Sequence, residues 1–185
     1  DVTGNRFANI TIINTTQSAI NLTDATDTDL INITFTDTPW DVYLNNASVF
    51  EYNMDDFSLE IENSQGGIKF LNRSLDATGD NLSDVIRITE NNVFVNSTVD
   101  PGFNQSANIS LALSGFNDPY ALVDHEDDGS FETCTGCMNL SWDTNTFVFN
   151  VSRFTSYRAG STPVVESVVI EPESPDSTDE LACYA

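Results

Sequence analysis

Basic residues are almost absent from this sequence. Its 185 residues include six Lys and Arg, of which Lys69 is the only lysine, and one histidine, against 29 Asp and Glu, so the formal net charge is −23. A chain this acidic repels a phosphate backbone, which argues against nucleic-acid binding. An acidic surface suits solubility, cation binding or a salty medium, and the charge alone does not choose among these.

Long apolar runs are also missing. No stretch approaches the roughly 20 apolar residues of a membrane-spanning helix. The chain starts at Asp1 in polar sequence without a signal-peptide pattern, so we expect any such segment to have been removed. No long amphipathic helix is visible, and 84–88 offers at most one turn. The sequence therefore predicts an all-β protein.

Catalytic signatures are equally scarce. The sequence has no nucleophile elbow, phosphate-binding loop or histidine metal cluster. Carboxylate pairs such as Asp55-Asp56 are too frequent for their spacing to single out a general acid and base. We therefore expect no enzymatic activity. A polysaccharide-processing β-helix protein is kept as the weaker alternative, by analogy of fold only.

Asparagine occurs unusually often in one context. The chain has 20 Asn, and 38 of its residues are Ser or Thr, so chance alone gives about four Asn-x-Ser/Thr sequons. Twelve occur, none with Pro in the middle: Asn9, Asn14, Asn21, Asn32, Asn46, Asn72, Asn81, Asn96, Asn104, Asn108, Asn139 and Asn150. The excess predicts covalent N-linked glycans and an extracellular or cell-surface location. The alternative is that Asn and Thr simply line exposed strand faces.

The sequons also fit the geometry of a strand. Residues i and i+2 of a strand share a face, so Asn9 and Thr11 are expected to face solvent while Ile10 faces the core. The same alternation is predicted around Ile33, Ile109, Leu140 and Val151.

Residues 7–29 and 30–50 form two copies of one unit. The segment 9–12 (NITI) matches 32–35 (NITF) at an offset of 23, and Ile20 matches Val42 at an offset of 22. Two short strands per repeat of roughly 22 residues are typical of a parallel β-helix coil. Two coils are fewer than such a stack usually needs. The chain is therefore cut from a longer β-helix, or these strands join another sheet, or the first strand pairs with a neighbouring subunit.

Short apolar strands separated by Gly and Asn turns continue to residue 115, which indicates an antiparallel β-sandwich. The clearest strand pair follows at 140–151, where apolar and polar residues alternate on both sides of 143–146. Asp and Asn bond their own backbone in turns, so 143–146 predicts a hairpin turn.

A family resemblance is carried by three runs: GGIKFLN (66–72), VIRITENNVFVNSTVDPGFNQSANISL (85–111) and CTGCMNLSWDTNTFVFNVSRFTSY (134–157). Together they resemble a β-rich module of large archaeal cell-surface and secreted proteins. In that family the module follows β-helix coils and precedes immunoglobulin-like repeats. The likeness covers about residues 58–160 and rests on strands, sequons and the paired cysteines.

The resemblance extends to both ends of the chain. Residues 163–185 resemble the opening strands of an immunoglobulin-like domain, with a V-x-I-x-P strand, a Ser-Pro-Asp turn and a strand containing a cysteine. We expect β-helix-like coils or N-terminal strands at 1–56, a sandwich module at 57–160, and a linker with the first strands of a further domain at 161–185.

The three cysteines divide into a pair and a remainder. Cys134 and Cys137 are close enough in sequence to bridge, and we predict a structural disulfide in an extracellular setting. Zinc would need two more ligands, and His125 is the only histidine. A redox motif would need a strand-to-helix context that is not apparent. The remaining Cys183 indicates a missing partner, which we expect beyond residue 185 if the tail is a truncated domain.

The acidic loop before these cysteines is a candidate Ca²⁺ site. Carboxylates at alternate positions followed by Gly129 resemble the first half of a calcium loop. The candidate ligands are Asp124, Glu126, Asp128, Ser130 through its carbonyl, and Glu132. Position 12 is Thr135 instead of Glu, so the loop is not a full EF-hand. The alternative is a solvated charge cluster in a turn.

These features predict an extracellular structural glycoprotein, a subunit or segment of a surface layer, sheath or filament. Its partners would be copies of itself or adjoining domains of a longer parent. An unpaired edge strand is a liability, so we expect a terminal strand, 7–13 or 164–171, to pair with a neighbour; the alternative is ordinary pairing within one monomer. A glycan-binding or adhesive module is the main functional alternative, which Trp40, Tyr43 and Tyr52 exposed on one face would favour.

Overall fold

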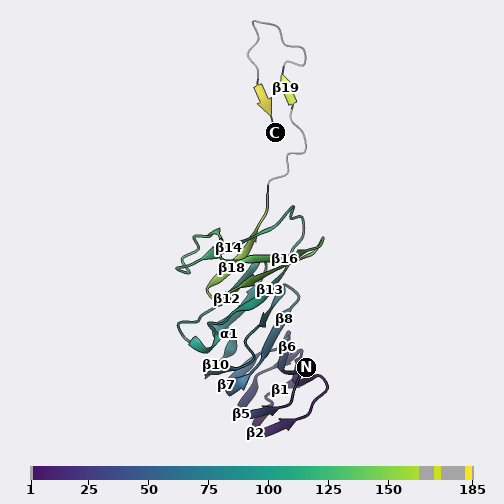
Figure 1. Cartoon of the computed structure of the whole chain (residues 1–185), viewed down its shortest axis with the longest axis vertical. Coiled ribbons are helices and arrows are strands. Elements are labelled where there is room, and N and C mark those ends of the chain that lie inside the picture. The colour runs from purple at the N-terminus through teal and green to yellow at the C-terminus, as the bar shows by residue number, and fades with distance from the viewer. Residues whose placement is uncertain (1, 163–168, 172–181, 185) are drawn as a thin grey trace.

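The structure is a computed structural model that describes residues 2–162, 169–171 and 182–184. It confirms that the protein is all-β (Figure 1). Within these ranges the helical content is the four-residue α1 (Leu82–Val85) and the 3₁₀ turn η1 (Pro101–Phe103). No described helix has the length and apolar character needed to cross a membrane.

The first part of the chain is a stack of parallel strands. Its elements are β1 (Val2–Thr3), β2 (Arg6–Ile13), β3 (Ser18–Thr23), β4 (Ala25–Thr26), β5 (Thr28–Thr36), β6 (Trp40–Asn45), β7 (Val49–Phe57) and β8 (Leu59–Asn63). All of the pairs are parallel: β1 with β4, β2 with β5, β5 with β7, β3 with β6, and β6 with β8. The chain therefore passes through the same sheets in successive turns, and β7 and β8 form the third turn.

The register of this stack follows the sequence repeat. Ile10 lies opposite Ile33, at an offset of 23, and Ile20 lies opposite Val42, at an offset of 22. The third turn departs from this spacing because Val42 lies opposite Leu59, only 17 residues further on. Parallel stacking thus places equivalent residues of the two predicted copies directly against each other.

Asn and Asp residues with positive φ bend the strands at equivalent points in successive turns. Asn9 and Asn32 have φ of 55° and 49°, and Asp24 and Asn46 have φ of 51° and 49°. Left-handed backbone is accessible to Asn and Asp because their short polar side chains bond locally. Asn32 Nδ2 donates to Asn9 Oδ1 at 3.3 Å, and Asn46 Nδ2 donates to Asp24 Oδ1 at 2.7 Å. The predicted alternation of a straight strand therefore does not hold at Asn9.

Antiparallel pairing takes over after β8. The elements are β9 (Gly66–Phe70), β10 (Leu75–Asp80), β11 (Ile86–Thr89), β12 (Asn92–Val95), β13 (Ala107–Ala112), β14 (Tyr120–Asp124), β15 (Glu132–Thr133), β16 (Met138–Trp142), β17 (Thr146–Val151) and β18 (Ser156–Gly160). They extend two sheets of the stack into the orders β10-β7-β5-β2 and β16-β17-β13-β9-β8-β6-β3, and add a third sheet, β11-β12-β18-β14-β15. The sequence predicts a boundary between β-helix-like coils and a sandwich module at residues 56 and 57. The sheets are continuous across this boundary.

A single hydrophobic core connects the two parts. It extends from Ile20 on β3 to Ala159 on β18. Phe103 is buried in this core, and its ring centroid lies 6.1 Å from that of Tyr52 of β7 and 5.6 Å from that of Phe70 of β9. Burying a Phe side chain stabilises a fold by about 1.5–3 kcal/mol, so this aromatic row anchors the stack to the antiparallel sheets.

The hairpin predicted at 140–151 is confirmed as β16 and β17. The Asp143 carboxylate accepts hydrogen bonds from the backbone N–H of Asn145 at 2.8 Å and Thr146 at 2.7 Å, which lower the pKa of this carboxyl. The inward direction predicted for Leu140 is wrong, because this side chain is 44% exposed. Leu140 lies at a shift of register between Asn139 and Ser141 on the edge strand β16, and such bulges re-aim side chains.

The C-terminal hairpin consists of β19 (Val169–Glu171) and β20 (Ala182–Tyr184), with Ile170 opposite Cys183. The pairing agrees with two strands in this tail. The other residues of the strand predicted at 164–171, and the turn predicted at 174–176, lie outside the described residues.

Candidate functional site

The loop that follows β14 is organised around its first residue. Asp124 is 2% exposed, and its carboxylate accepts the backbone N–H groups of Glu126 at 3.2 Å, Asp128 at 3.3 Å and Gly129 at 2.6 Å. Asp side chains often close turns in this way. The oxygens that the sequence assigns to the first position of a cation site therefore face the backbone of their own loop.

Asp127 is not among the candidate calcium ligands at alternate positions, and it holds the loop against the start of β18. Its Oδ1 accepts hydrogen bonds from Thr155 Oγ1 at 2.9 Å and Ser156 Oγ at 2.8 Å. Asp127 has a φ of 54°, which turns its side chain out of the series formed by its neighbours. The hydroxyl partners are 28 and 29 residues away, so no local sequence signal identifies this role.

The remaining predicted calcium ligands do not converge. Glu126, Asp128, Ser130 and Glu132 are all exposed. Hydrogen bonds from Ser130 lower the pKa of Asp128, so this carboxylate is also occupied locally. Among the described residues, no group of three or more His, Cys, Asp or Glu side chains is placed to hold a metal ion. Ca²⁺ binding by this loop stays a prediction without geometric support.

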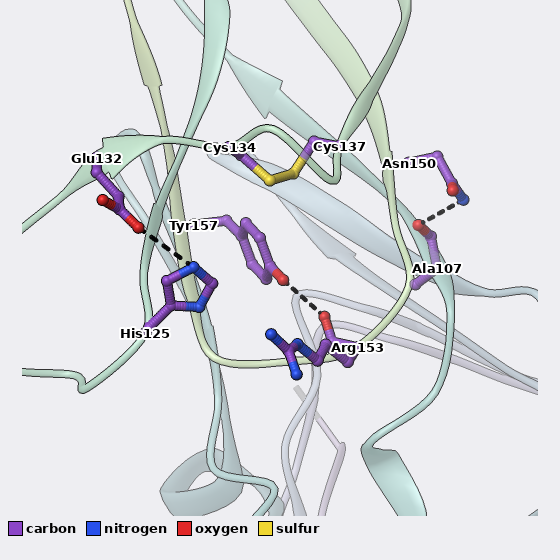
Figure 2. Close-up of a disulfide and its surroundings, with 8 residues drawn as sticks. All are labelled: Ala107, His125, Glu132, Cys134, Cys137, Asn150, Arg153 and Tyr157. Carbon is purple, nitrogen blue, oxygen red and sulfur yellow. Dashed lines mark hydrogen bonds and ion pairs between the residues drawn. A yellow bond between two sulfur atoms is a disulfide. The ribbon is translucent and has the colours of Figure 1, made fainter.

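The cysteine pair forms a disulfide beside this loop (Figure 2). The two Sγ atoms are 1.99 Å apart and the Cα atoms 5.4 Å apart. The backbone N–H of Cys134 donates to the carbonyl of Ala121 on β14 at 2.9 Å, which holds the disulfide against the sheet. A pocket of about 310 Å³ lies between the disulfide, β14 and the turn that joins β17 to β18.

Polar side chains surround this pocket. His125 Nε2 lies 3.4 Å from Glu132 Oε1, and the Arg153 side chain extends along the opposite side, beside the Tyr157 ring (Figure 2). Tyr157 Oη donates to the backbone carbonyl of Arg153 at 2.7 Å. Burial raises the pKa of Tyr157 to about 12, so its hydroxyl stays protonated at neutral pH. Pairing of β14 with β18 brings these groups together, and their spacing in the sequence did not reveal them.

The predicted glycosylation residues all reach the surface. None of the twelve sequon Asn is buried, and the more exposed ones are Asn9, Asn14, Asn21, Asn32, Asn46, Asn104 and Asn139. The aliphatic residues Ile33, Ile109 and Val151 are buried, with exposures of 3%, 0% and 1%, as expected. Ile10 departs from this pattern at 36%.

Two sequons lie directly opposite each other on neighbouring strands. Asn108 of β13 is paired with Asn150 of β17, and Asn150 Nδ2 donates to Asn108 Oδ1 at 3.1 Å and to the Ala107 carbonyl at 3.0 Å. Both hydrogens of this amide are engaged. A glycan on Asn150 would replace one of them.

The aromatic residues named as a glycan-binding face do not form one. Tyr52 is 2% exposed and packs in the core. Trp40 and Tyr43 are half-buried, and the Trp40 ring is covered by Lys69 Nζ, 4.4 Å from the ring centroid. Burial in the core accounts for Tyr52 and cation–π contact for Trp40, while the Tyr43 hydroxyl donates to the Glu62 carboxylate.

Comparison of the chain with protein-family models, with curated proteins and with solved structures found no match. The fold and the site define an all-β protein with a disulfide beside a polar pocket.

Proposed function

We propose that this protein is an extracellular structural glycoprotein, a subunit or segment of a cell-surface layer, sheath or filament, in which strand pairing contributes to assembly. The observation that carries the proposal is the open edge of the parallel stack. Within the described chain, β2 has β5 as its only neighbour and β3 has β6 as its only neighbour, so each ends its sheet.

Side-chain burial shows what an additional strand would cover. Ile10 on β2 is 36% exposed, whereas its partner Ile33 on β5 is 3% exposed. Asn9 and Asn32 have the same left-handed backbone, so this bend does not explain why Ile10 is more exposed than Ile33. β5 has a strand on each side and β2 has one. The exposure of Ile10, and of Ile13 at 55%, is therefore that of an incompletely covered strand.

An open parallel edge favours an occupant with a matching repeat. Such an edge presents free N–H and C=O groups, and strand addition satisfies them while side-chain pockets give specificity. The register of β2 on β5 supports a β-helix-like coil as the occupant, from a second copy or from adjoining sequence. Repeated head to tail between copies, the contact is heterologous and generates a filament unless it closes into a ring.

The surface chemistry supports the glycoprotein part of the proposal. The chain has twelve sequons, three times the number of about four that chance gives. None of their Asn residues is buried, and they occur in both parts of the fold. The disulfide fits an oxidising compartment. The archaeal origin implied by the resemblance remains part of the proposal and is independent of the edge argument.

Charged substitutions on β2 provide the test. Ile10→Lys together with Ile13→Lys puts two cations on the open edge, and Leu71→Lys, 46% exposed and outside β2 and β3, is the matched control. We expect the native and control chains to self-associate in light scattering and electron microscopy, and the double variant to stay monomeric. A native chain that remains monomeric at all concentrations contradicts assembly through copies of itself.

A further inference from the structure

The pocket beside the disulfide differs in charge from the rest of the molecule. Its lining contains His125, Arg153 and one carboxylate, Glu132. The chain has 29 acidic residues, six Lys and Arg and one histidine, so two of these seven basic side chains line a single pocket of about 310 Å³. By contrast, the groove on the outer face of the five-stranded sheet contains one arginine and two carboxylates, Asp124 and Asp127.

Arg153 has no carboxylate partner in the described part of the chain. Arg6 and Lys69 each lie within 4.0 Å of a carboxylate, and Arg87 and Arg158 each stack on a phenylalanine ring. Neither kind of contact forms at Arg153 among residues 2–162. A guanidinium has five donors in a planar fork that matches a carboxylate, so this group is available for an anionic partner.

The structure below Arg153 fixes the position of its backbone. Tyr157 donates to the Arg153 carbonyl at 2.7 Å, and Tyr157 is itself 4% exposed within the core. The Tyr157 ring and the disulfide form the apolar wall of the pocket, with Val123 and Val151 also in its lining (Figure 2). A charged rim above an apolar wall suits a small ring that carries one acidic group.

We propose that this pocket binds a hexuronic acid, with the sugar carboxylate held by Arg153 and the ring packed on Tyr157 and the disulfide. The volume lies near the lower limit of small-molecule sites, about 300 Å³, which fits a single sugar ring. Arg153 forms a two-pronged hydrogen bond to the carboxylate. The His125 ring on the same rim supplies a second hydrogen bond to the acid, and the exposed pair with Glu132 that it gives up contributes little in water.

The test is titration of the whole chain with glucuronic acid, followed by NMR or calorimetry, with glucose as the neutral control. We expect millimolar binding of glucuronic acid and none of glucose. Arg153→Gln removes the charged hydrogen bonds and should weaken binding about tenfold or more. Arg158→Gln is the matched control, because its guanidinium lies 4.0 Å from the Phe131 ring and outside the pocket lining.

Three results would overturn the proposal: no binding of glucuronic acid, equal binding of glucose, or equal loss in the Arg158 control. His125→Gln provides a second variant, which should weaken binding without touching the core, because His125 is exposed and lines the pocket. A glucuronic acid oligomer distinguishes the source of the ligand. Tighter binding of the oligomer identifies the end of a glycan chain, and equal binding identifies the free sugar acid.

Discussion

Asp41 should be one of the most sensitive polar residues in the fold. It lies on β6 and is 5% exposed, and its carboxylate accepts the N–H of Ser58 at 2.7 Å, the Ser58 hydroxyl at 2.8 Å, and the hydroxyl of Thr38. Ser58 itself is fully buried, between β7 and β8. This carboxylate therefore fastens the third turn of the parallel stack to the second.

The magnitude follows from the hydrogen bonds that Asp41→Ala removes. A hydrogen bond to a charged group contributes about 1.5–3 kcal/mol, so the two bonds from Ser58 amount to about 3–6 kcal/mol. Removing a buried charge also relieves its desolvation, which offsets part of that sum. We expect a net loss of about 3 kcal/mol in the free energy of unfolding, and a fall in Tm of about 6–12 °C for a domain of this size.

Urea unfolding and calorimetry measure this loss. Asp55 is an exposed aspartate on β7, the next strand along the chain, and Asp55→Ala should change the free energy of unfolding by less than about 0.5 kcal/mol. In a double-mutant cycle with Ser58→Ala, the coupling energy should exceed about 1 kcal/mol. A loss in Asp41→Ala no larger than in the Asp55 control, or additive double mutants, would refute the role of Asp41.

Further predictions concern charge, cross-linking and modification. Burial raises the pKa of Asp100, so its contribution to stability is complete below its unfolded pKa of about 3.9 and is lost as the pH rises through its folded pKa. Asp100→Asn should therefore gain stability relative to the native chain as the pH rises above about 3.9 in urea titrations. Non-reduced peptide mapping should find Cys134 joined to Cys137, and two free thiols there would contradict the structure. Native protein should exceed 20.3 kDa until deglycosylated, with fuller occupancy at Asn139 than at Asn150, since both amide hydrogens of Asn150 are engaged; glycopeptide mass spectrometry checks both points.

The parallel register could be predicted because equivalent residues stack. The match of Ile10 with Ile33 and of Ile20 with Val42 became strand pairing in the structure. The third turn could not be predicted, because its offset shortens to 17 at Leu59 and it lacks the Asn-Ile-Thr pattern. Periodicity detects a repeat only while its length is constant.

The site was harder to predict than the fold, for two physical reasons. A carboxylate at the start of a turn can bind a cation or accept hydrogen bonds from the amides of its own loop, and the same sequence pattern is compatible with both. The Asp124 carboxylate accepts hydrogen bonds from its own loop. The pocket beside the disulfide depends on pairing of β14 with β18, which brings Arg153 near His125 although the two are far apart in the sequence. Local spacing carries no information about such a contact. Leu140 was mispredicted for a related reason, since alternation cannot reveal a bulge on an edge strand.

The parallel stack also has a mechanical consequence. Its strands bond to the turns above and below, and β7 and β8 also bond to the antiparallel β10 and β9, along the long direction of the body in Figure 1. A pull between the two ends of that body stretches these bonds in series, so we expect the stack to peel one turn at a time while the antiparallel sheets hold. A turn of 23 residues releases up to about 75–80 Å of extended chain. Single-molecule stretching should therefore show early steps of that length, as in an extensible tether, and a single all-or-none rupture would contradict this behaviour.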